Sequence, residues 1–99
     1  MTRIYLSGPM TGLPELNVPA FNAEAARLRR NGYLVVNPAE INPDAQAKWE
    51  DCMRADLREL LTCDVLALLP NWHGSKGAHL EVQVAHRIGM QICDSAAIA

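Results

Sequence analysis

Residues 64–89 read DVLALLPNWHGSKGAHLEVQVAHRIG, and this stretch decides the fold class. The five residues after Asp64 are all apolar, which is typical of a central strand that is covered on both faces. Pro70 ends this strand, residues 71–76 form a loop, and residues 77–89 have the apolar spacing of a helix. The stretch therefore predicts one strand, one loop and one helix in succession.

The same alternation extends over the whole chain. We predict strands at residues 3–7, 33–37, 64–69 and 90–93, and helices at residues 19–30, 48–62 and 77–89. Pro19 suits the first turn of a helix, and Gly32 suits the position after a helix end. This order predicts a single α/β domain over residues 1–99, with a parallel sheet of about four strands and helices on both of its faces.

The loops predicted at residues 8–18, 38–47 and 71–76 follow the first three strands. Because parallel strands run in one direction, these loops meet at one edge of the sheet, beyond the carboxyl ends of the strands. Open α/β sheets bind their ligands at this edge. The sequence therefore predicts a binding site between these loops.

Two acidic residues interrupt apolar helix faces. Glu81 falls within the apolar arc of its helix, and Asp56 fills the missing position of the stripe formed by residues 49, 52, 53, 57, 60 and 61. A carboxylate that faces a core is costly unless it is paired, hydrogen-bonded or used in chemistry. Buried structural acids that pair with Arg54 or Arg58 are one interpretation. Because two neighbouring elements each carry such an acid, we favour a shared site.

The composition argues against several classes of function. A net charge of −2 and scattered basic residues do not suit a protein that grips a nucleic-acid polymer, and the cluster Arg27, Arg29 and Arg30 is interpreted as a solvated helix face. Three cysteines without a CxxC motif indicate free thiols in a reducing compartment, and we expect no metal or other cofactor. The sequence has neither a signal peptide nor an apolar run long enough for a membrane, which predicts a soluble cytoplasmic protein.

The loop after the first strand is a candidate substrate-binding segment. Its small residues can bring backbone N–H groups close to a phosphate or a sugar, although a tight strand–helix turn is the commoner reason for such residues. The candidates are Ser7, Gly8, Pro9, Met10, Thr11 and Gly12.

Four further candidates lie elsewhere in the chain. Ser75 and Gly77 are at the start of the third helix, where Ser75 is either an N-cap or a ligand contact. Trp72 either stacks on a base or packs on the sheet edge. Tyr5 on the first strand has a position that is more often a core position than a catalytic one.

Four segments resemble the nucleoside 2-deoxyribosyltransferase superfamily, which includes the deoxynucleoside 5′-monophosphate N-glycosidases. They are IYLSGPMTG at 4–12, RADL at 54–57, CDV at 63–65 and SKGAHLE at 75–81, and the chain is most similar to short, mostly phage and bacterial members. The resemblance implies a flavodoxin-like or Rossmann-like fold and a dimer or larger oligomer. It also implies an enzyme that cleaves or transfers the N-glycosidic bond of a 2′-deoxynucleoside or its 5′-monophosphate.

The resemblance also implies roles for single residues. Glu81 would be the nucleophile that attacks C1′ of the deoxyribose, Asp56 would be the acid that assists departure of the base, and Tyr5 would position the nucleophile and the sugar. Ser75 occupies a position that is Ser in the monophosphate glycosidases and Asp in many transferases, which implies a contact with a 5′-phosphate.

Two departures from the superfamily support an alternative function. The loop at 8–12 lacks the basic residue of the monophosphate glycosidases, and the tail after Cys93 is short. The alternative is a non-catalytic nucleotide-binding or sequestering module on the same fold.

The predicted helix at 77–89 is apolar over more than half of its circumference. One face of a sheet cannot cover that much apolar surface. We therefore predict a homodimer or larger homo-oligomer with this helix in the interface.

Overall fold

The computed structural model describes residues 1–41 and 47–99. Its four strands form one parallel sheet in the order β2-β1-β3-β4. The strands are β1 (Arg3–Ser7), β2 (Leu34–Val36), β3 (Val65–Leu68) and β4 (Gln91–Asp94).

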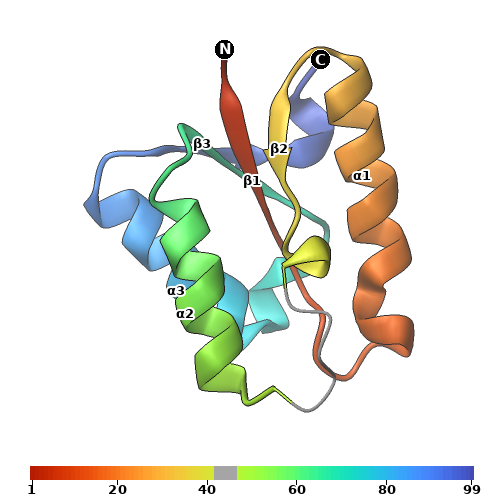
Figure 1. Cartoon of the computed structure of the whole chain (residues 1–99), viewed down its shortest axis with the longest axis vertical. Helices are drawn as coiled ribbons and strands as arrows, with labels where there is room; N and C mark the ends of the chain where they lie inside the picture. The colour runs from red at the N-terminus through yellow and green to blue at the C-terminus, as the bar shows by residue number, and fades with distance from the viewer. Residues whose placement is uncertain (42–46) are drawn as a thin grey trace.

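Three helices connect these strands. They are α1 (Val18–Arg30), α2 (Trp49–Leu60) and α3 (Lys76–Arg87). Figure 1 shows α1 on one side of the sheet and α2 and α3 together on the other side. The α/β class, the four parallel strands and the helices on both faces are therefore confirmed.

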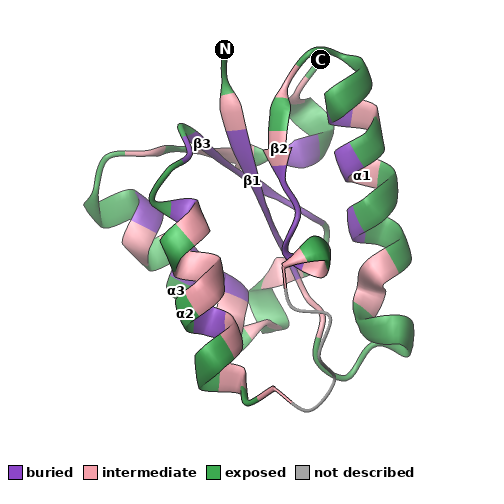
Figure 2. Ribbon diagram, in the orientation of Figure 1, coloured by how far each residue is buried: buried purple, intermediate pink, exposed green. Residues whose placement is uncertain are grey.

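The side chains of the two central strands alternate between two cores. Ile4 and Leu6 of β1 pack with α1, whereas Tyr5 of β1 packs on the opposite face with α2 and α3. The buried residues in Figure 2 accordingly follow the central strands and the helix surfaces that face them. Alternation of this kind follows from the two-residue period of a strand, and it places residues 5 and 7 on the same face.

The strand order changes direction at β1. The connection after β1 leads to β2 on one edge, and the connection after β3 leads to β4 on the other edge. The two chain segments therefore diverge beyond Ser7 and Leu68, which are paired at the carboxyl ends of β1 and β3. Such a switch point leaves space for a ligand.

The predicted element boundaries lie within two residues of the observed ones, and those of β1 are identical. The largest departure is in the predicted 8–18 loop, which contains a 3-10 turn at Pro14–Asn17 followed directly by α1. Glu15, Leu16 and Asn17 there have φ of 53°, 53° and 59°. Residues with a Cβ rarely adopt this left-handed conformation, so no sequence pattern indicated it. Residues 42–46 of the predicted 38–47 loop lie outside the described residues.

Predictions for the end of α1 had mixed outcomes. Gly32 has φ of 95° just after the helix, as a glycine in that position predicts. Arg27 is not simply solvated, because its guanidinium pairs with Glu24 at 2.6 Å and donates to the carbonyls of Ser95 and Ile98, both at 2.8 Å. A guanidinium has five N–H donors, so one side chain can bind the C-terminal segment at several points.

Candidate active site

The Glu81 side chain lies inside the protein although it is ionisable. Only 5% of the residue is exposed. Glu81 is in the second turn of α3, whose first turn is fixed by Ser75, because the Ser75 hydroxyl accepts a hydrogen bond from the Ala78 N–H at 3.2 Å. The predicted N-cap role of Ser75 is therefore confirmed, and the cap directs the start of α3 toward the carboxyl ends of the strands.

Two hydroxyl groups of β1 hold the Glu81 carboxylate. The Tyr5 hydroxyl donates to Oε2 at 2.5 Å, and the Ser7 hydroxyl donates to Oε1 at 2.7 Å. Both donors are buried, with exposures of 0% and 1%. Residues two apart on a strand point to the same face, which explains why one strand supplies both donors. Each carboxylate oxygen thus has its own donor.

Burial has the largest effect on the pKa of the Glu81 carboxyl. Burial raises the pKa of Glu81 to about 7, the hydrogen bonds from Tyr5 and Ser7 oppose this rise, and the nearby Asp56 adds to it. Burial, together with Glu81 and Asp56, raises the pKa of Tyr5 well above its usual range. The Tyr5 phenol therefore stays protonated and remains a donor to Glu81.

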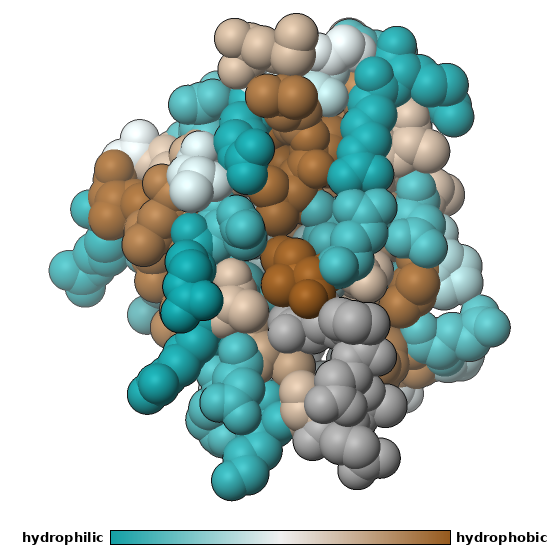
Figure 3. All heavy atoms as spheres, viewed as in Figure 1, coloured by the Kyte–Doolittle hydropathy of each residue, from teal (hydrophilic) through white to brown (hydrophobic). Residues whose placement is uncertain are grey.

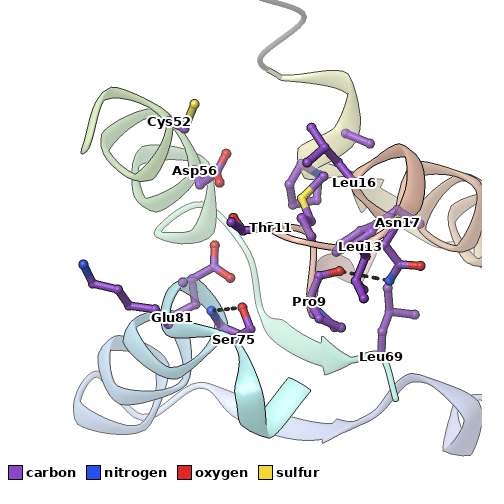
Figure 4. A pocket seen from close by; sticks show the side chains of 18 of the residues that line it. Pro9, Thr11, Leu13, Leu16, Asn17, Cys52, Asp56, Leu69, Ser75 and Glu81 are labelled. Carbon is purple, nitrogen blue, oxygen red and sulfur yellow. Dashed lines mark hydrogen bonds between the residues drawn. The ribbon is translucent and has the colours of Figure 1, made fainter. Parts of the chain in front are cut away.

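Asp56 approaches the same space from α2. It is half-buried, and burial raises its pKa to about 6. Figure 4 shows the Asp56 and Glu81 side chains directed toward a common cleft from their separate helices. The structure therefore brings together the two acids that interrupt the apolar helix faces in the sequence.

The cleft has a volume of about 1180 Å³ and lies at the carboxyl ends of β1 and β3. One wall comes from α2 and α3 and carries Asp56, Glu81, Ser75 and Lys76. The opposite wall comes from the 8–18 segment and α1 and is largely apolar. Figure 4 shows part of this wall, whose members include Met10, Leu13, Leu16, Val18 and Phe21. A polar, acidic wall facing an apolar wall suits a ligand with a sugar and a flat ring.

Most of the predicted binding residues line this cleft. They are Gly8, Pro9, Met10, Thr11, Ser75 and Gly77. Gly8 is also tightly packed, because a Cβ there would lie 2.8 Å from the Leu69 Cβ. Tyr5, Ser7 and Gly12 are not among the residues that line the cleft, and the hydroxyls of Tyr5 and Ser7 contact Glu81 instead.

The structure does not bring Trp72 to the cleft. Its ring stacks on His73 with centroids 4.1 Å apart, lies 5.2 Å from the His79 ring, and packs against the core on the α2 and α3 side. Of the two interpretations of Trp72, packing on the sheet is the one observed. The apolar area of an indole is large, which favours this position over an exposed one.

Lys76 and Trp49 line the cleft although neither was among the site residues predicted from the sequence. Lys76 is the only basic residue lining the cleft in the described parts of the chain, and its Nζ lies 4.2 Å from the centre of the Trp49 ring. Lys76 adjoins Ser75 in the predicted loop at 71–76, so its place in the sequence could have identified it as a cleft residue. Trp49 has the spacing of a core residue, and its place at the cleft depends on how α2 packs against α3.

Other features of the described residues bear on the type of site. No group of three or more His, Cys, Asp or Glu side chains in residues 1–41 and 47–99 is placed to hold a metal ion. Cys63 and Cys93 are free thiols. In the described residues no helix has both the length and the apolar character that a bilayer crossing requires.

Comparisons with known proteins give a family and a fold. A family model described as a domain of unknown function (DUF4406) matches residues 2–94. A search of curated proteins finds no significant match.

Two solved structures share the fold. A 2-deoxyribosyltransferase from Bacillus psychrosaccharolyticus superposes with a TM-score of 0.73 at 20% identity, over 92% of this chain and 69% of that one. A CMP N-glycosidase from Clostridium botulinum superposes with a TM-score of 0.62 at 21% identity, over 92% of this chain and 66% of that one. The fold is therefore that of the 2-deoxyribosyltransferases, as the resemblance implied.

Proposed function

This chain belongs to the family described as a domain of unknown function (DUF4406), and from its cleft we propose that it cleaves or transfers the N-glycosidic bond of a 2′-deoxynucleoside or its 5′-monophosphate. The observation that carries the proposal is the buried Glu81 carboxylate, fixed by two hydroxyl donors at a cleft that also contains Asp56. Proteins of the same fold include a 2-deoxyribosyltransferase and a CMP N-glycosidase, which supports chemistry at a glycosidic bond.

The proposed reaction uses the two carboxyl groups in different roles. Glu81 forms a bond to C1′ while the bond from C1′ to the base nitrogen breaks, and the electron pair of that bond leaves with the base. Asp56 gives the base a proton as it departs. Asp56 then takes a proton from water or from a second base, which attacks C1′ and releases Glu81. Tyr5 keeps the nucleophile in position through its hydrogen bond to Oε2.

The polar wall offers contacts for the 5′ end of the substrate. Ser75 and Lys76 lie at the N-terminal end of α3, where the helix dipole favours a negative charge. The backbone of Gly8 to Thr11 borders the same cleft. We propose that these groups receive the sugar and a 5′-phosphate, while the apolar wall receives the base.

The direct test is release of free base. The protein is incubated separately with the four common 2′-deoxynucleosides and with their 5′-monophosphates, and the products are separated by chromatography. We expect free base from at least one of them, and transfer to an added second base would identify a transferase. Binding of a nucleotide by calorimetry without any release of base would contradict the proposal and would indicate the non-catalytic module.

We also propose that the chain forms a homodimer or larger homo-oligomer through α3. Leu80 of α3 and Ile88, the residue directly after its end, are 37% and 52% exposed, with the half-buried Val84 between them at helical spacing. Figure 3 shows hydrophobic side chains at the surface beside the C-terminal ends of α2 and α3. A continuous apolar strip of this kind is typical of an interface between subunits.

Light scattering at micromolar concentration checks this assembly. We expect the mass of a dimer or larger species for the wild type and that of a monomer for Ile88→Asp. Leu34→Asp is the matched control, because Leu34 is 46% exposed on the edge strand β2, away from α3. A monomeric wild type, or equal dissociation by both variants, would show that α3 is not the interface.

A further inference from the structure

Ser7 is the least expected member of the site. The sequence places it at the head of a candidate substrate-binding loop, yet it is the last residue of β1, only 1% exposed, and absent from the lining of the cleft. Its hydroxyl donates to Oε1 of Glu81 at 2.7 Å. The contact of Ser7 with the site is therefore made through Glu81 and not at the surface of the cleft.

The arrangement of donors gives this contact a specific consequence. With Tyr5 alone, one oxygen of Glu81 would be held and the carboxylate could rotate about that hydrogen bond. A second donor on the other oxygen fixes the plane of the carboxylate and the direction of its lone pairs. A donor to a carboxylate also favours its ionised form.

The surroundings of Glu81 make that second effect important. Burial and the Asp56 carboxylate on α2 both disfavour the ionised form, and the groups that favour it are the two β1 hydroxyls. Lys76, on the same helix as Glu81, lies over the Trp49 ring, and none of the ion pairs within residues 1–41 and 47–99 includes Glu81. In the described parts of the chain, hydrogen bonds rather than a salt bridge stabilise the charged nucleophile.

From this geometry we infer that Ser7 is a positioning residue for the glycosidic reaction, which aims the Glu81 carboxylate at C1′ and keeps it ionised. The inference rests on the proposed function, since it assigns Ser7 a task within that reaction. Ser7, which the sequence suggested as a substrate-binding residue, is thereby assigned to holding the nucleophile Glu81. Tyr5 and Ser7 then form one unit on one face of β1, with a donor for each oxygen.

The test compares Ser7→Ala with Ser7→Thr. Alanine removes the donor from Oε1, whereas threonine keeps a hydroxyl and suits a strand. For Ser7→Ala we expect kcat to fall by about 10-fold to 100-fold with little change in KM, because a hydrogen bond to a charged group contributes about that much. Ser7→Thr is expected to recover most of the rate. Ser7→Cys, which keeps the size but donates weakly, replaces Ser7→Ala if the alanine variant does not fold.

The pH dependence separates positioning from a merely structural role. Removing the Ser7 hydroxyl makes the ionised form of Glu81 less favourable and so raises the pKa of Glu81. The centre of the bell-shaped rate profile is then expected to move to higher pH. The same rise in the pKa of Glu81 should appear when the carboxyl groups of isotope-labelled glutamate are titrated by NMR. The Glu81 signal is the one that is missing from the spectrum of Glu81→Gln.

Ser95→Ala is the matched control. Ser95 is also 1% exposed, and its hydroxyl donates to the Glu24 carboxylate at 2.5 Å, in the C-terminal segment outside the cleft. The Ser95→Ala variant loses a buried hydrogen bond from a hydroxyl to a carboxylate, as Ser7→Ala does. We therefore expect a changed melting temperature but an unchanged pH profile.

Two results would overturn the inference. One is an unchanged pKa of Glu81 in Ser7→Ala, and the other is a loss confined to KM, which would make Ser7 a substrate contact. The NMR titration needs no turnover. A wild type that releases no base therefore overturns the proposed function, whereas the titration decides separately whether Ser7 controls Glu81.

Discussion

Replacing Glu81 with glutamine is expected to lower the rate of base release by about 10⁴-fold or more, because the nucleophile is lost. Glutamine is the most informative substitution, because it removes the nucleophile while its side-chain amide can still form hydrogen bonds with the Tyr5 and Ser7 hydroxyls. Alanine would also remove the nucleophile, but it would leave two buried hydroxyls without their acceptor. The measurement is the initial rate of base release under the conditions in which the wild type is active.

The stability of the same variant has a predictable pH dependence. The pKa of Glu81 rises from 4.5 to about 7 in the folded protein, so between these values the folded state binds more protons than the unfolded state. The free energy of unfolding of the wild type therefore falls as the pH rises through this window, by on the order of 3 kcal/mol. Glu81→Gln removes this contribution, so it should be as stable as the wild type at low pH and more stable above pH 7.

Glu50→Gln is the matched control for Glu81→Gln. Glu50 is an exposed acid that lines the same cleft from the first turn of α2. We expect this substitution to leave the rate within a few-fold of the wild type, because an exposed carboxylate in that place has no role in the proposed reaction. Unchanged turnover in Glu81→Gln would rule out Glu81 as the nucleophile.

Replacing Asp56 with asparagine is expected to slow the first, bond-cleaving step strongly on natural substrates and only slightly on a nitrophenyl deoxyriboside. Asparagine keeps the shape of the side chain but has no acidic proton to give. A natural base is a poor leaving group that needs the proton, whereas nitrophenolate leaves without it. We therefore expect the rate on natural substrates to fall by about 10²-fold to 10⁴-fold. The rate of the first turnover on each substrate measures the difference directly, because the second step uses Asp56 with either substrate.

The pH profiles provide a second measurement of the same role. Burial raises the pKa of Asp56 to about 6, so its protonated form is lost as the pH rises above that value. Turnover of a natural deoxynucleotide by the wild type should therefore decline at high pH, whereas turnover of the nitrophenyl substrate should not. Because Asp56 and Glu81 influence each other, the two limbs of the profile belong to the pair.

Asp51→Asn is the control for the Asp56 experiment. Asp51 is an exposed acid on the same helix, and its replacement should leave both substrates unaffected. Equal losses on the two substrates in Asp56→Asn, together with a lower melting temperature, would show that Asp56 supports the fold instead of donating a proton.

The sequence alone predicted the layered architecture and the two acids. Strand and helix periods are local properties, so the alternation of elements could be recognised without knowledge of how they pack. The same locality identified Glu81 and Asp56, because each interrupts an apolar helix face. Glu81 is 5% exposed, as its place in the apolar arc predicted.

Only the tertiary structure decided which groups surround those acids. Ser7 and Glu81 are 74 residues apart in the chain, and their contact depends on the packing of α3 against β1. The apolar wall depends on three consecutive left-handed residues at Glu15, Leu16 and Asn17, a conformation that no periodic pattern specifies. Trp72 was equally suited to a ligand and to the core by its sequence, and the packing of its half-buried ring against the core decided between them. Local sequence patterns determine the helices and strands and which of their faces are apolar. Which faces contact each other depends on strand order and packing, because these contacts join residues that are distant in the chain.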